Sequence, residues 1–140
     1  MDYKTIEENS KKRKTLYTEL SIDQLKILLS NSNTISNTIL VIKFGATWCG
    51  PCQKIKSHCY NLFSQTNSNI LCFDIDIDND INAKLYSAFK TKKMIKGVPT
   101  IMAYDCGKSR NLDHWYIPDQ SVSGSDLNKI SIFFNSLKLM

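Results

Sequence analysis

The sequence lacks any long apolar run, and this absence excludes one class of protein. Its longest apolar stretch is far below the roughly 20 residues that a membrane-spanning helix needs. The first residues are polar and charged and contain no apolar core of a secretory signal. The 140 residues are 42% hydrophobic, which suits one domain that buries its own core. We therefore expect a cytoplasmic protein without a membrane span, and a nuclear or virion location stays open.

Arginine is also scarce, since only Arg13 and Arg110 stand among 18 basic residues. Nucleic-acid sites use arginine for bidentate contacts, and the net charge of +5 does not form one long stripe. We therefore do not expect nucleic-acid binding and interpret the charge as an aid to solubility. Residues 1–14, which end in Lys11-Lys12-Arg13-Lys14, are expected to form a solvated basic arm before a domain over 15–140. A nuclear-import signal or a patch for an acidic partner is the alternative.

The cysteines are odd in number, and no framework of paired disulfides is expected from them. They are Cys49, Cys52, Cys59, Cys72 and Cys106. An odd count without a secretory signal favours a reducing compartment. A zinc site at Cys49 and Cys52 would need two more ligands at a suitable spacing, which the other cysteines and the histidines lack. The other three cysteines are expected to be small apolar or surface residues, with a regulatory role for Cys59 as the alternative.

Hydrophobic periodicity predicts alternating strands and helices. Strands are expected at 16–18, 39–44, 70–77, 100–104 and 121–123, and helices at 22–30, from the first cysteine pair to about 67, at 81–90 and from about 125 onward. Ser21 and Gln24 resemble a capping box at the start of the first helix. The continuous apolar run at 39–42 is typical of a strand buried on both faces. This order predicts an α/β fold in which a central mixed β-sheet has helices on both faces.

The segment Trp48-Cys49-Gly50-Pro51-Cys52 follows the buried strand and opens a helix. Free backbone N–H groups and the helix dipole at this position favour a negative sulfur on Cys49. The thiolate is the nucleophile, so Cys49 is the candidate attacking residue. Cys52 lies one turn further on, where its sulfur can attack a mixed disulfide. Pro51 suits the first helical turn, and Gly50 lets another backbone approach.

Three segments together resemble the thioredoxin family. Residues 46–52 resemble its active-site signature, and Gly97-Val98-Pro99-Thr100 resembles its cis-proline segment. Gly124 with the helix after it resembles the end of the family's fold. The resemblance extends over about 15–140 and implies a thioredoxin fold. It also implies a thiol–disulfide oxidoreductase that reduces protein disulfides.

The resemblance also implies a role for each site residue. Cys49 would be the attacking thiolate and Cys52 the resolving thiol, while Pro99 would be a cis-proline that faces them. An apolar substrate groove would be lined by Trp48, Val98, Pro99 and Gly124. Trp48 would be exposed in this arrangement, and its burial in the core is the alternative.

The family also implies what the protein works with. No cofactor is expected beyond the redox-active disulfide Cys49–Cys52, and electrons would come from an NADPH-dependent flavin reductase. The expected partners are protein disulfides and this thioredoxin reductase-like donor, and the expected state is a monomer. The Gly50-Pro51 dipeptide favours the reductase direction. A protein disulfide isomerase or oxidase, and a non-catalytic binding module with the thioredoxin fold, remain the alternatives.

One departure from the family concerns charge near the cysteines. The position six residues before Cys49, where the family usually has a buried aspartate, is Lys43. The aligned position of the next strand, where many members have a lysine, is Asp74. We hypothesise a reversed pair in which Lys43 faces Asp74 and stabilises thiolate. The alternative is that Lys43 extends to a solvated edge.

A second departure is the extended loop at about 107–121, which is longer than the family's usual hairpin. It contains His114, Trp115, Tyr116 and Pro118. We expect the loop to fold back over the surface of the domain, and a contact with a specific partner is the alternative. His114 is not expected to bind a metal, because it lacks companions.

Overall fold

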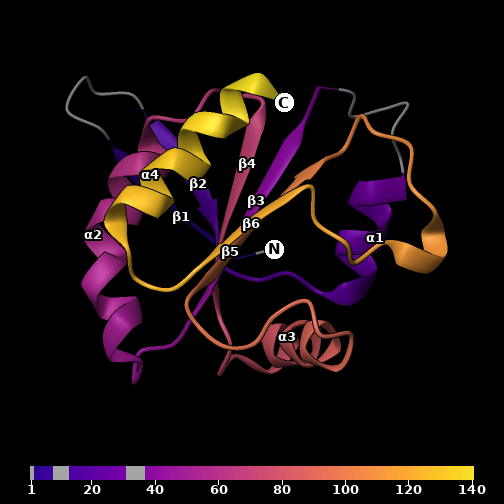
Figure 1. Ribbon diagram of the computed structural model, residues 1–140, viewed down its shortest axis with the longest axis horizontal. Helices are drawn as coiled ribbons and strands as arrows, with labels where there is room; N and C mark the ends of the chain where they lie inside the picture. Colours follow the sequence, from indigo (N-terminus) through magenta and orange to yellow (C-terminus); the bar gives the residue numbers. More distant parts are fainter. Residues whose placement is uncertain (1, 8–12, 31–36) are drawn as a thin grey trace.

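The computed structural model describes residues 2–7, 13–30 and 37–140. One mixed sheet runs through the molecule in the order β1-β2-β4-β3-β5-β6, with helices on both faces (Figure 1). The strands are β1 (Tyr3–Glu7), β2 (Arg13–Tyr17), β3 (Ile39–Gly45), β4 (Ile70–Asp76), β5 (Thr100–Asp105) and β6 (Gln120–Ser123). The helices are α1 (Ile22–Ser30), α2 (Gly50–Ser64), α3 (Asp80–Thr91) and α4 (Leu127–Ser136), with short 3-10 helices η1 (Leu112–His114) and η2 (Leu137–Leu139). The predicted α/β class is confirmed.

Strand β3 is buried along its whole length, as its apolar sequence predicts. It pairs in parallel with β4 and antiparallel with β5. Successive side chains point to opposite faces, so Val41 contributes to the core under α2 and α4, whereas Leu40 and Ile42 contribute to the core under α1 and α3. Figure 1 shows these two helix pairs on opposite sides of the sheet.

The helices begin at the side chains that the sequence offers as caps. The capping box at α1 is present, because Ser21 N–H donates to Gln24 Oε1 and Gln24 N–H donates to Ser21 Oγ at 2.9 and 3.1 Å. Asp126 caps α4 by accepting from two backbone N–H groups. Helix α2 ends at Ser64, earlier than expected. No helix of the described residues has the length and apolar character that crossing a membrane requires.

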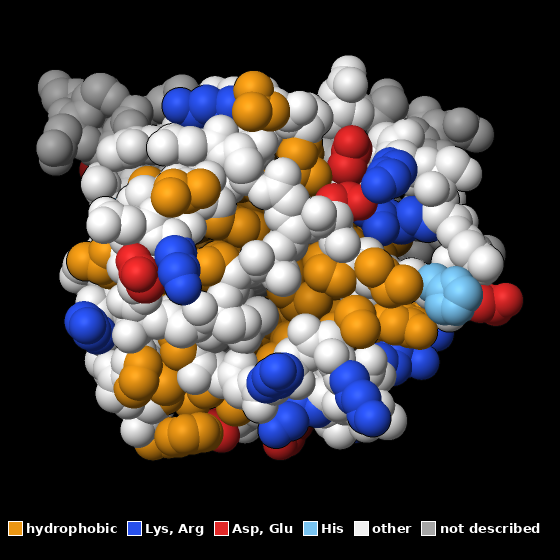
Figure 2. Space-filling view, in the orientation of Figure 1, with side chains coloured by type: hydrophobic (Ala, Val, Ile, Leu, Met, Phe, Trp, Pro, Cys, Tyr) orange, Lys and Arg blue, Asp and Glu red, His pale blue; other side chains and the backbone are white. Residues whose placement is uncertain are grey.

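The expectation of a solvated arm over 1–14 is wrong for the part that the structure describes. Residues 3–7 form β1, which pairs antiparallel with β2 from Tyr3↔Tyr17 to Glu7↔Arg13. Backbone hydrogen bonds and the packing of Ile6 against the core under α2 and α4 hold this strand in place. Lys11 and Lys12 of the basic cluster lie outside the described residues. The basic side chains on the face in Figure 2 are scattered among neutral and hydrophobic ones.

The long loop folds back over the domain, as expected. Trp115 is 7% exposed and its ring centroid lies 5.8 Å from that of Phe89 on α3. The Tyr104 hydroxyl donates to the Tyr116 carbonyl at 2.8 Å. Asp119 pairs with Arg110 within the loop. The loop therefore extends the core on the α1 and α3 side of the sheet.

Replacing Trp115 by alanine is expected to lower the free energy of unfolding by about 3 kcal/mol, because the ring would leave a cavity beside Phe89. Denaturation in guanidinium chloride measures the change. Ile117→Ala, at a 46% exposed position of the same loop, is the control and should cost less than about 0.5 kcal/mol. Equal losses in the two variants would contradict a role of the loop in the core.

Candidate active site

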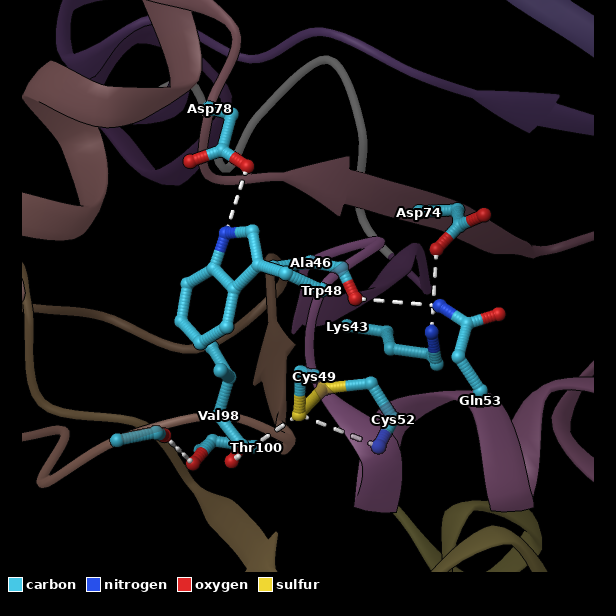
Figure 3. Close-up of a disulfide and its surroundings, with 11 residues drawn as sticks. Lys43, Ala46, Trp48, Cys49, Cys52, Gln53, Asp74, Asp78, Val98 and Thr100 are labelled. Atoms are coloured by element: carbon cyan, nitrogen blue, oxygen red, sulfur yellow. Dashed lines mark hydrogen bonds and ion pairs between the residues drawn. A yellow bond between two sulfur atoms is a disulfide. The ribbon is translucent and has the colours of Figure 1, made fainter.

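The two motif cysteines form a disulfide at the start of α2 (Figure 3). Their Cα atoms are 5.2 Å apart. Cys49 is the N-cap of the helix, and its Sγ accepts the backbone N–H of Cys52 at 3.2 Å. Pro51 occupies the first turn, where no hydrogen bond from its nitrogen is needed. When the disulfide is reduced, the same N–H and the helix dipole stabilise a thiolate at Cys49.

The segment at Val98 and Pro99 lies directly beside this disulfide. The peptide bond between these two residues is cis. The carbonyl oxygen of Val98 lies 3.8 Å from Cys49 Sγ. Gly124 adopts a φ of +94°, which favours glycine, and its N–H donates to the Pro99 carbonyl at 3.0 Å. The structure therefore places Val98 next to Cys49 and holds Gly124 against Pro99.

Trp48 projects into solvent beside the cysteines, and the alternative of a core position is wrong. The residue is 67% exposed. Its indole N–H donates to Asp78 Oδ2 at 2.8 Å, which fixes the ring at the rim of the site (Figure 3). Together with Val98 it provides apolar surface around the disulfide.

Lys43 and Asp74 form the reversed ion pair that we hypothesised. They are register partners on β3 and β4, and Lys43 Nζ lies 3.3 Å from Asp74 Oδ1. The Lys43 side chain is only 6% exposed, so the alternative of a solvated lysine is wrong. Because side chains of a strand alternate between its two faces, Lys43 lies on the same face as Val41, under α2. The register between β3 and β4 then places the Asp74 carboxylate next to it.

A cavity of about 210 Å³ lies between this pair and the start of α2. Cys52 lines it, together with Gly45, Lys43 and Asp74. Among the lining residues that sequence reasoning missed are Lys4 on β1 and Tyr60 on α2. The sequence carried little signal for Lys4, because so short and polar a segment is also typical of a solvated tail.

Asp74 is held in its charged form by its neighbours. Burial alone would raise the pKa of Asp74, but Lys43, Lys4 and the Tyr60 hydroxyl together lower it below its ordinary value of 3.8. Lys4 shows the matching effect, because partial burial would lower its pKa whereas Tyr60 and Asp74 raise it. Asp74 is therefore a carboxylate and Lys4 an ammonium group at neutral pH, and Asp74 lies between the amino groups of Lys4 and Lys43.

The other three cysteines are free and buried. Burial raises the pKa of Cys59, Cys72 and Cys106 to about 11 each, so these thiols are poor nucleophiles near neutral pH. The structure thus confirms them as small buried residues, and a regulatory role for Cys59 stays a prediction. In the described parts of the chain, no three His, Cys, Asp or Glu side chains form a group that could hold a metal ion.

The site combines a cysteine pair at a helix N-terminus with a cis-proline segment, on a mixed sheet. This combination is typical of the class of proteins that catalyse thiol–disulfide exchange. Comparison with known proteins places the chain within that class. The sequence profile of the Thioredoxin family matches residues 23–116. A thioredoxin from Ovis aries is 38% identical over 107 residues, which are 75% of this chain and 85% of that protein. The chain belongs to the thioredoxin family.

A longer relative extends the comparison. Thioredoxin 3 from Plasmodium falciparum is 33% identical over 127 residues, which are 90% of this chain. The chain spans only 62% of the length of that relative. Among solved structures, a Plasmodium falciparum thioredoxin superposes with a TM-score of 0.61 at 21% identity, covering 98% of this chain and 96% of its own. A Malassezia sympodialis thioredoxin gives a TM-score of 0.61 at 23% identity, covering 86% of this chain and 91% of its own. These structures show the thioredoxin fold.

The lowered pKa of Asp74 makes its contribution to stability dependent on pH. Its ionised form stabilises the fold fully above the ordinary pKa of 3.8, and this contribution is lost as the pH falls through the lower pKa of the folded state. Asp74→Asn is expected to lower the free energy of unfolding at pH 7 by about 3 kcal/mol, because Lys43 would stay buried without a counter-charge. The variant should also lose less stability than the wild type during acidification.

Urea denaturation at a series of pH values measures both effects. Glu7→Gln is the matched control, because it breaks the exposed ion pair with Arg13 and should cost less than about 1 kcal/mol. A stability of Asp74→Asn equal to that of this control at pH 7 would contradict the assigned role of the buried pair.

Proposed function

We propose that this protein is a thiol–disulfide oxidoreductase that reduces disulfides of other proteins through Cys49 and Cys52. The observation that carries the proposal is the disulfide at the N-terminus of α2, bordered by exposed Trp48 and by the Val98 carbonyl. Cys49 is the more accessible of the two cysteines, with 6% exposure against 2%. An incoming sulfur therefore meets Cys49 first.

The reaction is a transfer of two electrons in two exchange steps. The Cys49 thiolate attacks one sulfur of the substrate disulfide, forms a mixed disulfide and releases the other sulfur as a thiolate. Cys52 then loses its proton to solvent and attacks Cys49 Sγ. The substrate leaves as its second thiolate, and the protein retains the Cys49–Cys52 disulfide. The substrate is reduced and the protein is oxidised by the same two electrons.

Val98 provides the contact that orients the substrate in this proposal. Its carbonyl lies 3.8 Å from Cys49 Sγ, where an extended backbone bound beside it would bring a substrate disulfide to the attacking sulfur. Trp48, Val98, Pro99 and Gly124 are proposed to line this groove. Its apolar surface suits peptide segments of many sequences rather than one small molecule.

The oxidised protein needs an electron donor, and we propose an NADPH-dependent flavin reductase of the thioredoxin reductase type. A solved complex of ferredoxin:thioredoxin reductase with thioredoxin f2, in which a chain of this fold superposes with a TM-score of 0.61 at 18% identity, supports a reductase partner in general. The NADPH-dependent flavin type is proposed from the family resemblance alone. No bound cofactor is needed, since the disulfide itself carries the electrons. A cytoplasmic location and a monomeric state complete the proposal, and the three free buried cysteines fit a reducing compartment.

A second function, oxidation or isomerisation of protein thiols, is favoured by one observation. Lys43 lies buried near Cys52, where the family usually has an aspartate. A cation near the cysteines stabilises the reduced, partly ionised form, and this makes a pair more oxidising. The reduction potential of Cys49 and Cys52 separates the two functions.

Single substitutions of the two cysteines should have different effects. Cys49→Ser is expected to abolish catalysed insulin reduction in the presence of dithiothreitol, leaving the uncatalysed rate. Cys52→Ser should accumulate a covalent adduct with a disulfide substrate, because the resolving thiol is missing. Mass spectrometry under non-reducing conditions detects the adduct. An adduct formed equally well by Cys49→Ser would overturn the assignment of Cys49 as the nucleophile.

The potential of the pair should lie nearer that of a reductase than that of an isomerase. Equilibration in glutathione or dithiothreitol buffers, followed by Trp48 fluorescence, measures it. The expected value is closer to about −270 mV, typical of thioredoxin, than to about −180 mV, typical of protein disulfide isomerase. A value of about −180 mV would contradict the proposed reductase and support an oxidase or isomerase instead. A pair that does not exchange at all would favour a binding module.

A further inference from the structure

The proposed chemistry leaves the charged lining of the cavity behind Cys52 without a role. The ionisable side chains that face the cavity come from four elements: Lys4 on β1, Lys43 on β3, Lys56 and Tyr60 on α2, and Asp74 and Asp76 on β4. Three ammonium groups face two carboxylates, so this lining has an excess of one positive charge at neutral pH. Cys52 lines the same cavity, whereas Cys49 is not among its residues.

Lys4 reaches this group from the N-terminal strand. Its Nζ lies 3.1 Å from Asp74 Oδ2, donates to the Tyr60 hydroxyl and lies 4.5 Å from the centre of the Tyr60 ring. The Tyr60 hydroxyl itself donates to Asp74 Oδ2 at 2.9 Å. One oxygen of the carboxylate is therefore occupied by Lys4 and Tyr60, and the other oxygen faces Lys43 at 3.3 Å.

Lys43 is the ammonium group of this cluster that borders Cys52 across Gly45. A methyl group placed on Gly45 would lie 3.5 Å from Lys43 Nζ and 3.7 Å from Cys52 Sγ. The two atoms are thus at most about 7 Å apart, on either side of a residue without a side chain. Figure 3 shows Lys43 extending between Asp74 and the first turn of α2.

We propose that Lys4 is a positioning residue of the redox site, which binds Asp74 and thereby leaves the cluster of Lys4, Asp74 and Lys43 with a net positive charge beside Cys52. The proposal rests on the function proposed above. A carboxylate paired with one lysine forms a neutral pair, and a second ammonium group on the same carboxylate leaves the cluster with a net positive charge. This charge favours the thiolate of Cys52 over its neutral thiol.

The step that benefits is the release of the substrate. Cys52 gives its proton to solvent in the cavity, and its sulfur then uses the freed electron pair to form the bond to Cys49 Sγ. The bond between Cys49 and the substrate breaks, and the substrate sulfur leaves with that bonding pair. A larger fraction of Cys52 thiolate makes this resolving step faster, because the thiolate is the nucleophile.

Titration of Cys52 tests the proposal in the 140-residue chain that carries Cys49→Ser. The pH at which half of Cys52 is thiolate, followed by ultraviolet absorbance, should rise by about half a unit in Lys4→Met, which is about a threefold loss of thiolate at a given pH. The three buried cysteines have pKa values of about 11 and lose their protons only at strongly alkaline pH. Lys54→Met removes an exposed charge of α2 outside the cavity and should leave the midpoint unchanged.

Two further variants separate charge from a structural role. Lys4→Arg keeps the charge and should keep the midpoint, whereas Tyr60→Phe removes a hydrogen bond without removing a charge and should also keep it. Thermal unfolding of each variant records losses of stability separately. The proposal is overturned if Lys4→Met titrates like Lys54→Met, or if Tyr60→Phe shifts the midpoint as much as Lys4→Met does.

A rate measurement on protein with both cysteines completes the test. The mixed disulfide of Cys49 with glutathione should resolve about twofold more slowly in Lys4→Met than in the wild type at pH 7, because the threefold loss of thiolate outweighs the higher nucleophilicity of a more basic sulfur. The variant should be no slower than the wild type when Cys52 is fully ionised in both. An equal rate at pH 7 would overturn the proposal. A wild type that fails to reduce protein disulfides would instead reject the proposed function, while the Cys52 titration would still report on Lys4.

Discussion

The burial of β3 on both faces is the constraint on which the rest of the structure depends. Successive side chains of a strand between two layers of helices enter two separate cores. The position of each residue of 39–45 therefore determines the core in which its side chain lies. The same alternation directs Lys43 under α2, where apolar neighbours would make an unpaired charge costly. Asp74, its register partner on β4, removes that cost. A packing rule thus determines which charge lies near the redox-active sulfurs.

The active site is assembled from segments that are far apart in the sequence but adjacent at one end of the sheet. Strand β3 leads into the cysteine pair, and the turn before β5 brings Val98 within contact of Cys49. Gly124, just after β6, is hydrogen-bonded to Pro99. The disulfide is therefore held between the start of a helix and a segment anchored by the sheet, a rigid base for a reaction that needs exact alignment of sulfur atoms.

The sequence predicted most of the fold and the inner part of the site. Continuous or alternating apolar runs predicted the strands around 39–44 and 70–77, and local spacing identified Cys49 and Cys52. The pairing of Lys43 with Asp74 followed from comparing two positions that differ from the family in sign. The N-terminal strand was missed, because its five residues include a single aliphatic side chain, Ile6, and so carry almost no hydrophobic periodicity. Its place depends on pairing with β2 and on contacts with Tyr60, which no local pattern reveals.

Strand β1, which the sequence did not predict, is one edge strand of the sheet, and β6 is the other. The unpaired N–H and C=O groups of an edge strand can bind a strand of another molecule, which leads to aggregation. Here β6 has only four residues, three of them polar, and β1 carries charged Lys4 and Glu7. Both edge strands are therefore poor templates for the addition of another chain. The apolar strands β3 and β4 lie in the centre of the sheet, away from both edges. The sheet thus resists the addition of further strands although it is open and not a closed barrel.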